Sequence, residues 1–261
     1  MIRRKKYWTL FILLGFSFSI NSQITETDHQ MFWGSFGLHK KLSKDVSLNY
    51  YQINSFNLNT GQINFIQSDI GLNLKLANHW STGINYTPTF SIDNIAGNQL
   101  VYHRLSAKLK FRHKIVRHLY MKNYLVAEYH FTQRAKWQER FYFRFDLEYK
   151  NKHKMPWKLK PYISQKLYWY QNGRLLQYYN PNGDKTLLAS PNGLHAYRLK
   201  TGFKLYPSEK WSFNFYFLKQ KEFNTKLFGS KDINNLNPNS GRIRRSFYDF
   251  KVWGLSVGYK L

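Results

Sequence analysis

The sequence predicts an all-β protein, an antiparallel transmembrane up-and-down β-barrel of about twelve strands, in a range of roughly ten to twelve. Three observations predict this fold. Apolar residues alternate with polar ones over long segments, short and long connections alternate between these segments, and basic residues gather on one phase of them. Each observation is typical of strands that present one face to lipid and the other to a polar interior.

The first observation is a period of two residues, which belongs to β-strands because successive side chains point to opposite faces. Phe141, Phe143 and Phe145, for example, alternate with Arg144 and Asp146. A tilted strand needs about 9–11 residues to cross a bilayer, whereas strands of soluble proteins have about 5–6. Most of the alternating segments have about ten to fourteen residues, so their length favours a membrane barrel. They lie near 31–40, 45–55, 63–76, 79–91, 99–112, 118–131, 139–151, 157–170, 195–206, 210–223 and 247–261.

The second observation is the alternation of connection lengths. The short connections are 41–45, 77–79, 113–117, 151–156 and 207–210, whereas the segments 171–194 and 224–246 are long and rich in Asn, Gly and Pro. We therefore expect short periplasmic turns and longer outer loops. Trp80, Trp157 and Trp211 each follow a short turn on the apolar phase, which predicts an aromatic girdle at the membrane interface. Core positions of a β-sandwich are the alternative.

The N-terminus has the layout of a secretory signal peptide. Four basic residues at 3–6 precede an apolar run from Tyr7 to Ile20, and the sequence then becomes polar. We expect cleavage after Ser22, so that residues 1–22 are the signal peptide and 23–261 the outer-membrane β-barrel; an uncleaved anchor or a buried helix is the alternative. The chain has no cysteine. These features predict export to the outer membrane of a bacterium.

The strand count raises a difficulty, because bacterial barrels normally have an even number of strands. About eleven segments alternate clearly, so we expect a twelfth strand. Either residues 23–30 supply it, or part of 171–194 does, where RLLQYY and KTLLAS are candidates.

The third observation concerns charge. The chain has 40 basic and 14 acidic residues and a net charge of +26. A cation that faces lipid costs up to about 2–4 kcal/mol at the bilayer midplane, so a barrel must turn its basic residues inward. The alternating pattern does this, and it predicts a strongly basic interior that attracts anions. The basic residues expected to line it are Arg104, Lys108, Lys110, Arg112, Lys122, Arg140, Arg144, Lys158, Lys160, Lys166, Arg198, Lys200 and Lys204.

Other chemistry has weaker support. Asp146 and Glu148 could hold a metal ion, but Arg144 and Lys150 beside them favour salt bridges. None of the nine histidines lies in a known catalytic motif, so we expect no enzyme, no metal and no cofactor. Aromatic and basic residues mostly occupy opposite phases, which argues against nucleic acid as a partner.

The chain resembles a family of uncharacterised outer-membrane β-barrels common in Bacteroidota, of the DUF2490 type. Four stretches carry the resemblance: MFWGSFGLHKKLSKDVSLNYYQIN, RFYFRFDLEYKNK, WKLKPYISQKLYW and RLKTGFKLYPSEKWSFNFYFL. They fall within 31–261 and are diffuse patterns. The chain departs from the family at Gln165, where an acidic residue is common. The resemblance implies the fold and the location, and it implies no catalytic residue.

We therefore expect a porin-like outer-membrane barrel, a channel or binding barrel for small anionic solutes. An enzyme acting on lipid or lipopolysaccharide is the alternative. Expected partners are outer-membrane lipid, a small anionic solute and the outer-membrane assembly machinery. Lipopolysaccharide is a candidate partner for the loop cations, with a solvated loop as the alternative; these cations are Arg134, Lys136, Arg140, Arg242, Arg244 and Arg245. A C-terminal assembly signal is predicted from the alternate apolar residues Trp253, Leu255, Val257, Tyr259 and Leu261, although the terminal residue of such signals is usually aromatic.

Overall fold

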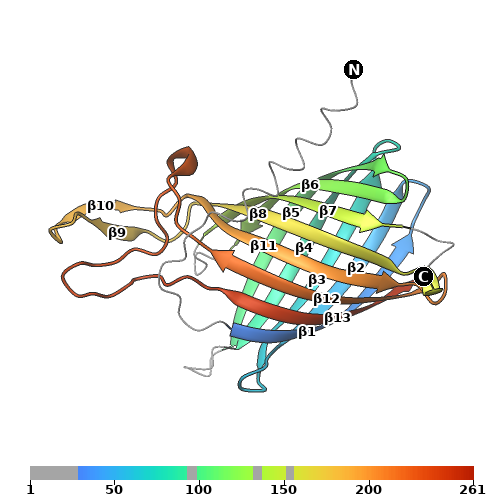
Figure 1. The fold of residues 1–261 in the computed structure, drawn as a ribbon, viewed down its shortest axis with the longest axis horizontal. Helices are drawn as coiled ribbons and strands as arrows, with labels where there is room; N and C mark the ends of the chain where they lie inside the picture. The colour runs from blue at the N-terminus through green and yellow to red at the C-terminus, as the bar shows by residue number, and fades with distance from the viewer. Residues whose placement is uncertain (1–28, 93–98, 132–136, 151–155) are drawn as a thin grey trace.

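The computed structural model of the protein describes residues 29–92, 99–131, 137–150 and 156–261; the predicted signal peptide, residues 1–22, lies outside them. The described residues form a closed β-barrel with a small two-stranded sheet beside it (Figure 1). The barrel strands are β1 (His29–Lys41), β2 (Val46–Asn57), β3 (Ile63–Lys75), β4 (Trp80–Ile92), β5 (Gln99–Val116), β6 (Leu119–His130), β7 (Glu139–Tyr149), β8 (Lys160–Gln171), β11 (Gly193–Leu205), β12 (Trp211–Glu222) and β13 (Phe250–Lys260). No helix in these ranges is long and apolar enough to cross a membrane.

The predicted fold class is confirmed, and the strand count falls within the predicted range. Eleven of the described strands close the barrel, one fewer than the favoured twelve. The two candidate segments within 171–194 form β9 (Leu176–Tyr179) and β10 (Lys185–Ala189), which pair with each other and not with the barrel. Of the other candidate, 23–30, only His29 and Gln30 are described, and they begin β1.

An odd number of strands can close because the first and last strands are parallel. All other neighbours in the barrel are antiparallel, whereas β1 and β13 run side by side in the same direction from His29↔Phe250 to His39↔Lys260. Three hydroxyl groups lie across this seam on the inner face. The Ser35 Oγ is 2.6 Å from the Ser256 Oγ and 2.7 Å from the Tyr51 Oη, which joins β1, β2 and β13.

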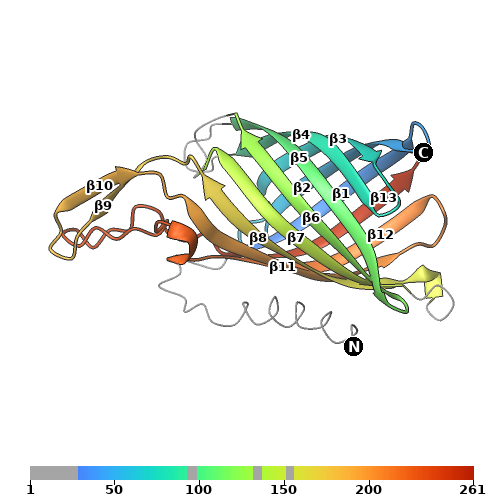
Figure 2. The same cartoon turned by 90° about the horizontal axis from the view of Figure 1, so that it is seen from above.

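The barrel has two unlike ends (Figures 1 and 2). The end near the C-terminus carries the turns after β1, β3, β5, β7 and β11, and we call it the turn end; we call the other the loop end. Most connections follow the predicted alternation. Two depart from it, because the β2–β3 turn, 58–62, is short at the loop end and the β7–β8 connection, 150–159, is long at the turn end.

The two longest loops fold into one body beyond the barrel, which we call the loop unit. It consists of 172–192, with β9 and β10, and of 223–249, and it projects from the loop end (Figures 1 and 2). The Tyr178 hydroxyl donates to the carbonyl of Asp232 at 2.9 Å, and the Asn239 amide donates to the carbonyl of Gly183 at 2.9 Å. Burial and Asp232 raise the pKa of the Tyr178 phenol to about 12, so at neutral pH it keeps the proton that it donates.

The outer face of the barrel is apolar and exposed between the two ends. Large apolar side chains with about half of their surface exposed lie on strands all around it, including Ile70 on β3, Ile84 on β4, Leu125 on β6 and Trp253 on β13. A soluble monomer rarely exposes a continuous apolar surface of this extent. Another apolar surface or an apolar solvent is therefore needed to cover this wall.

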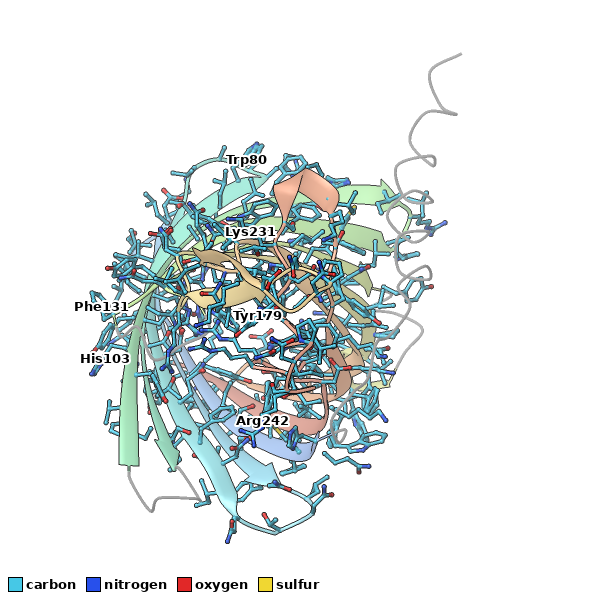
Figure 3. The ribbon with its side chains drawn as sticks, turned by 90° about the vertical axis from the view of Figure 1, so that its left-hand side faces the viewer. Trp80, His103, Phe131, Tyr179, Lys231 and Arg242 are labelled. Carbon is cyan, nitrogen blue, oxygen red and sulfur yellow. The ribbon has the colours of Figure 1, made fainter. Side chains whose placement is uncertain are left out.

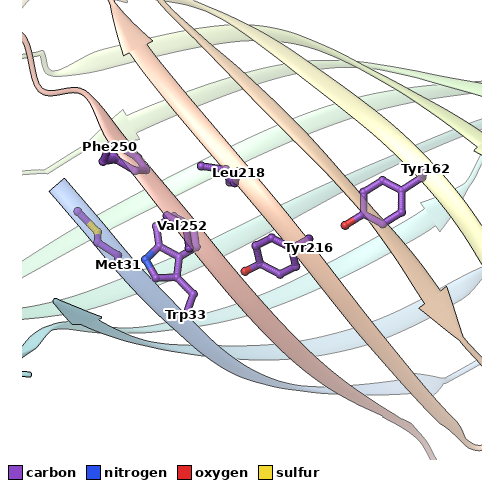
Figure 4. Close-up of a cluster of buried hydrophobic side chains, with 7 residues drawn as sticks. All are labelled: Met31, Trp33, Tyr162, Tyr216, Leu218, Phe250 and Val252. Carbon is purple, nitrogen blue, oxygen red and sulfur yellow. The ribbon is translucent and has the colours of Figure 1, made fainter. Parts of the chain in front are cut away.

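Part of the interior holds a cluster of buried apolar and aromatic side chains (Figure 4). It comprises Met31, Trp33, Tyr162, Tyr216, Leu218, Phe250 and Val252, which come from β1, β8, β12 and β13. The strand register explains how such large rings fit. Along one row, Trp33 lies opposite Gly254, Gly254 opposite Tyr216, Tyr216 opposite Gly202 and Gly202 opposite Tyr162. Each glycine leaves room for the ring beside it.

We expect Gly254→Ala to destabilise the barrel by about 1–3 kcal/mol, because the added methyl group overlaps the ring of Tyr216 and overpacks the cluster. Urea unfolding of the refolded barrel in detergent, followed by tryptophan fluorescence, measures the change. Gly34→Ala is the matched control, since a Cβ there meets only the Phe32 ring at an ordinary 3.6 Å. Equal unfolding midpoints for the two variants would contradict the account of the aromatic and glycine row.

Candidate functional site

The candidate site lies inside the barrel, where the structure places most of the predicted basic residues. Strand alternation brings them there, since each follows the inward phase of its strand. Lys158 is the exception: it lies exposed in the 3₁₀ turn Pro156–Lys158, because β8 begins only at Lys160. Its predicted position on the inward phase of a strand is therefore wrong.

One carboxylate, Glu128 on β6, joins two of the predicted basic residues near the loop end. Its side chain is 5% exposed; the Arg140 Nε lies 2.5 Å from one carboxylate oxygen, and the Arg104 Nε 3.6 Å from the other. Arg140 also lies over the rings of Trp137 and Tyr168, and Trp137 stacks on Tyr170 at 3.9 Å between centroids. This layer of ions and rings occupies the interior at the loop end.

A second carboxylate, Glu148 on β7, holds three lysines near the turn end. The Nζ atoms of Lys122, Lys150 and Lys204 lie 2.6, 3.0 and 3.0 Å from its oxygens, and the Glu148 side chain is 4% exposed. On the same strand the Asp146 carboxylate accepts two hydrogen bonds from the Arg144 guanidinium. Both carboxylates are thus ion-paired, as the neighbouring basic residues indicated.

Tyrosine rings contact many of the remaining basic groups. The Lys200 Nζ lies 3.4 Å from the centre of the Tyr216 ring, and such cation–π contacts stabilise a cation by roughly 0.5–2 kcal/mol. The others with a ring contact are Lys110 over Tyr124, Arg112 over Tyr120, Lys160 over Tyr206, Lys166 over Tyr142 and Arg198 over Tyr168. Tyrosine and basic residues therefore share the inner face, although the sequence pattern suggested that aromatic and basic residues mostly lie on opposite faces.

A cavity of about 620 Å³ occupies the other part of the interior, along β1 to β7. It reaches from the β1–β2 turn, where Lys44 and Asp45 are exposed, to Arg104 and Glu128 of the layer at the loop end. Seven basic side chains and three acidic ones line it. The basic ones are Lys41, Lys44, Lys75, Arg104, Lys108, Lys110 and Arg144, and the acidic ones are Asp45, Asp69 and Glu128.

The sequence pattern left some basic residues unassigned at both ends. Lys41, Lys44 and Lys75 line the mouth of the cavity but lie at or beside turns, where strand alternation gives no direction. Lys219 and Lys251 lie directly opposite each other on the outward phase of β12 and β13, beyond the exposed Trp253. Both lie near the loop end of their strands, past the apolar band, where an outward residue can be charged.

The predicted girdle residues all lie at the turn end. Trp80 begins β4 and Trp211 begins β12, with 41% and 42% of their surface exposed, and Trp157 is exposed in the β7–β8 connection. Trp80 packs on Phe111 and Trp211 on Tyr259, each pair with ring centroids 4.7 Å apart.

The residues of the predicted C-terminal signal share the outward phase of β13. Trp253 is 58% exposed and packs on Phe217, and Leu261 is 63% exposed just after the strand ends. Between them, Leu255, Val257 and Tyr259 lie opposite Phe215, Phe213 and Trp211 of β12. The alternation seen in the sequence is therefore a continuous apolar stripe on the outer wall.

The loops contribute further cations. Figure 3 looks onto the loop end, with Arg242 and Lys231 of the loop unit labelled. Arg245 donates to the carbonyl of Arg174 at 3.0 Å, which ties the two parts of the loop unit together. Residues 132–136, with the predicted loop cations Arg134 and Lys136, lie outside the described residues. Across the described ranges, no three His, Asp or Glu side chains are grouped so as to hold a metal ion.

Comparisons with protein-family models and with curated proteins find no match to this chain.

Proposed function

We propose that this protein is a bacterial outer-membrane β-barrel that binds small anionic solutes in its interior cavity. In this proposal the turn end faces the periplasm and the loop unit faces outward. The observation that carries the proposal is the cavity itself, whose walls hold seven basic side chains against three acidic ones. An anion that enters it meets several cations in a partly enclosed space, where charge interactions are stronger than in open water.

Two features support the location in a membrane. The outer wall exposes large apolar side chains on strands all around the barrel, and lipid is a phase that covers such a wall. Trp80, Trp157 and Trp211 lie together at one end, where an interfacial girdle is expected. The resemblance to uncharacterised outer-membrane barrels points the same way, and the apolar stripe on β13 is suited to recognition by the assembly machinery.

The interior favours binding over free passage. The aromatic cluster fills the interior beside the seam, and the layer of Glu128, Arg140 and Trp137 lies between the cavity and the loop end. A solute therefore has a route into the cavity from the turn end, and its onward path is obstructed by ordered side chains.

We expect the double variant Lys108→Gln and Lys110→Gln to weaken anion binding by about tenfold for each lysine, because each loses a charge-assisted contact. The measurement is calorimetric titration of the refolded barrel with pyrophosphate, in a neutral detergent at low salt. Binding by the wild type is expected to weaken as salt is added, since salt screens accessible charges.

Lys219→Gln combined with Lys251→Gln is the matched control, because it removes the same charge from the outer wall. This control is expected to bind pyrophosphate as the wild type does. No binding by the wild type, or an equal loss in both double variants, would contradict a specific site in the cavity.

A further inference from the structure

The cavity has two chemically different walls. On β5 and β7 its wall is cationic, with Arg104, Lys108, Lys110 and Arg144. On β2, β3 and β4 its wall is polar and mostly uncharged, with Ser47, Asn49, Asn73, Ser81 and Asn85 beside the charged Asp69 and Lys75. An inorganic anion would mainly use the first wall. The second wall offers hydrogen bonds to a ligand that also carries neutral polar groups.

The polar wall has hydrogen-bonding capacity that the protein does not use. Among the described residues, the side chains of Ser47, Asn73 and Ser81 hydrogen-bond to no protein group, so their donors and acceptors are available to a ligand. Asn85 has a different role: its amide donates to Asp69, and its oxygen accepts from the Lys108 Nζ at 3.2 Å. That contact holds the lysine where the two walls meet.

The cavity is larger than an inorganic anion needs. Its volume of about 620 Å³ corresponds to roughly twenty water molecules at about 30 Å³ each. It lies within the range of about 300–1,000 Å³ typical of pockets for organic ligands. Its few apolar lining residues include Val46, Leu74 and Val126, so a largely apolar ligand would leave the polar wall without partners.

We propose that the cavity binds an anionic saccharide, with its phosphate or carboxylate on the cationic wall and its hydroxyl groups on the polar wall. Hydroxyl groups both donate and accept hydrogen bonds, which matches side chains of Asn and Ser. This proposal rests on the proposed function, because it names the class of solute for the same site.

The test is calorimetric titration of the refolded barrel with glucose 6-phosphate, glucuronate, inorganic phosphate and glucose. Glucose 6-phosphate is expected to bind at least about tenfold more tightly than inorganic phosphate, and glucose to bind weakest of the four. Glucuronate distinguishes a carboxylate from a phosphate as the preferred anion. Asn73→Ala combined with Ser81→Ala is expected to weaken the binding of glucose 6-phosphate by about tenfold and the binding of inorganic phosphate much less. Lys108→Gln is expected to weaken the binding of both ligands.

Asn123→Ala is the matched control, because this amide lies on the outward phase of β6. It is expected to change no affinity. If glucose 6-phosphate binds no more tightly than inorganic phosphate, the saccharide proposal fails and the proposed anion site stands. If none of the anions binds, both proposals fail.

Discussion

Replacing Glu148 by glutamine is expected to cost the barrel about 3–5 kcal/mol of unfolding free energy, which is the usual effect of removing one partner from a buried ion pair. The side chain keeps its size, so packing is preserved and only the charge is lost. Three ammonium groups, those of Lys122, Lys150 and Lys204, then remain close together without a carboxylate between them. Urea unfolding of the refolded protein, followed by tryptophan fluorescence, gives the free energy.

Two further variants make this result interpretable. Glu139→Gln removes a carboxylate at the loop end of β7, where it accepts a hydrogen bond from the amide of Asn172. This substitution is expected to lower the unfolding free energy by less than about 1 kcal/mol. Adding Lys204→Met to Glu148→Gln removes one of the stranded cations and is expected to restore part of the loss. A loss of less than about 1 kcal/mol in Glu148→Gln alone would mean that water screens the three lysines.

Phe215→Lys is expected to destabilise the membrane-inserted barrel by about 2–4 kcal/mol, the range for a lysine on the lipid face near the midplane. Phe215 lies on the outward phase of β12, is 39% exposed and packs beside Phe203 with centroids 5.4 Å apart. Reversible folding into lipid vesicles, compared with the wild type, measures the change. The size of the change is informative, because the same substitution on a water-exposed surface usually changes the folding free energy by no more than about 0.5 kcal/mol.

Phe228→Lys is the matched control for this test. It makes the same substitution at a phenylalanine that is 80% exposed in the loop unit, outside the barrel wall. It is expected to change the folding free energy by less than about 0.5 kcal/mol. If both variants are equally neutral, water and not lipid surrounds the middle of the wall, and the proposed location is wrong.

The strands and their two faces were predictable from the sequence because both are local properties. A period of two residues assigns each side chain to a face without any knowledge of its neighbours. The alternation of its strand alone predicts Arg144 inside, and it lies inside against Asp146. Alternation gives no prediction beyond the end of a strand, and it fails for Lys158 because the chain turns before β8 begins.

The closure of the barrel was not predictable in the same way. Parallel pairing of β1 with β13 depends on which distant segments meet, and no local pattern encodes that choice. KTLLAS and RLLQYY have the composition of strands, but they form β10 and β9 in the loop unit. Their short length, compared with the barrel strands, was the one available signal.

The candidate site was predictable only in part, for a related reason. Alternation placed Lys108 and Lys110 inside, yet it could not show that the interior divides into a filled part and a cavity. That division depends on the sizes of side chains facing one another across the barrel, such as Tyr216 beside Gly254. The polar wall likewise becomes visible only when Asn73 and Ser81 lie beside one cavity.

The parallel seam has a consequence for the kinetics of folding. Ser35 and Ser256 meet across it although they lie 221 residues apart in the chain. Contacts of such long range form slowly, because the chain loses the entropy of a long loop before any new contact offsets that loss. One edge of β1 stays open and unpaired until β13 pairs with it. Such an edge is a template for pairing with other chains, so β1 needs protection for the whole time that the rest of the barrel takes to form.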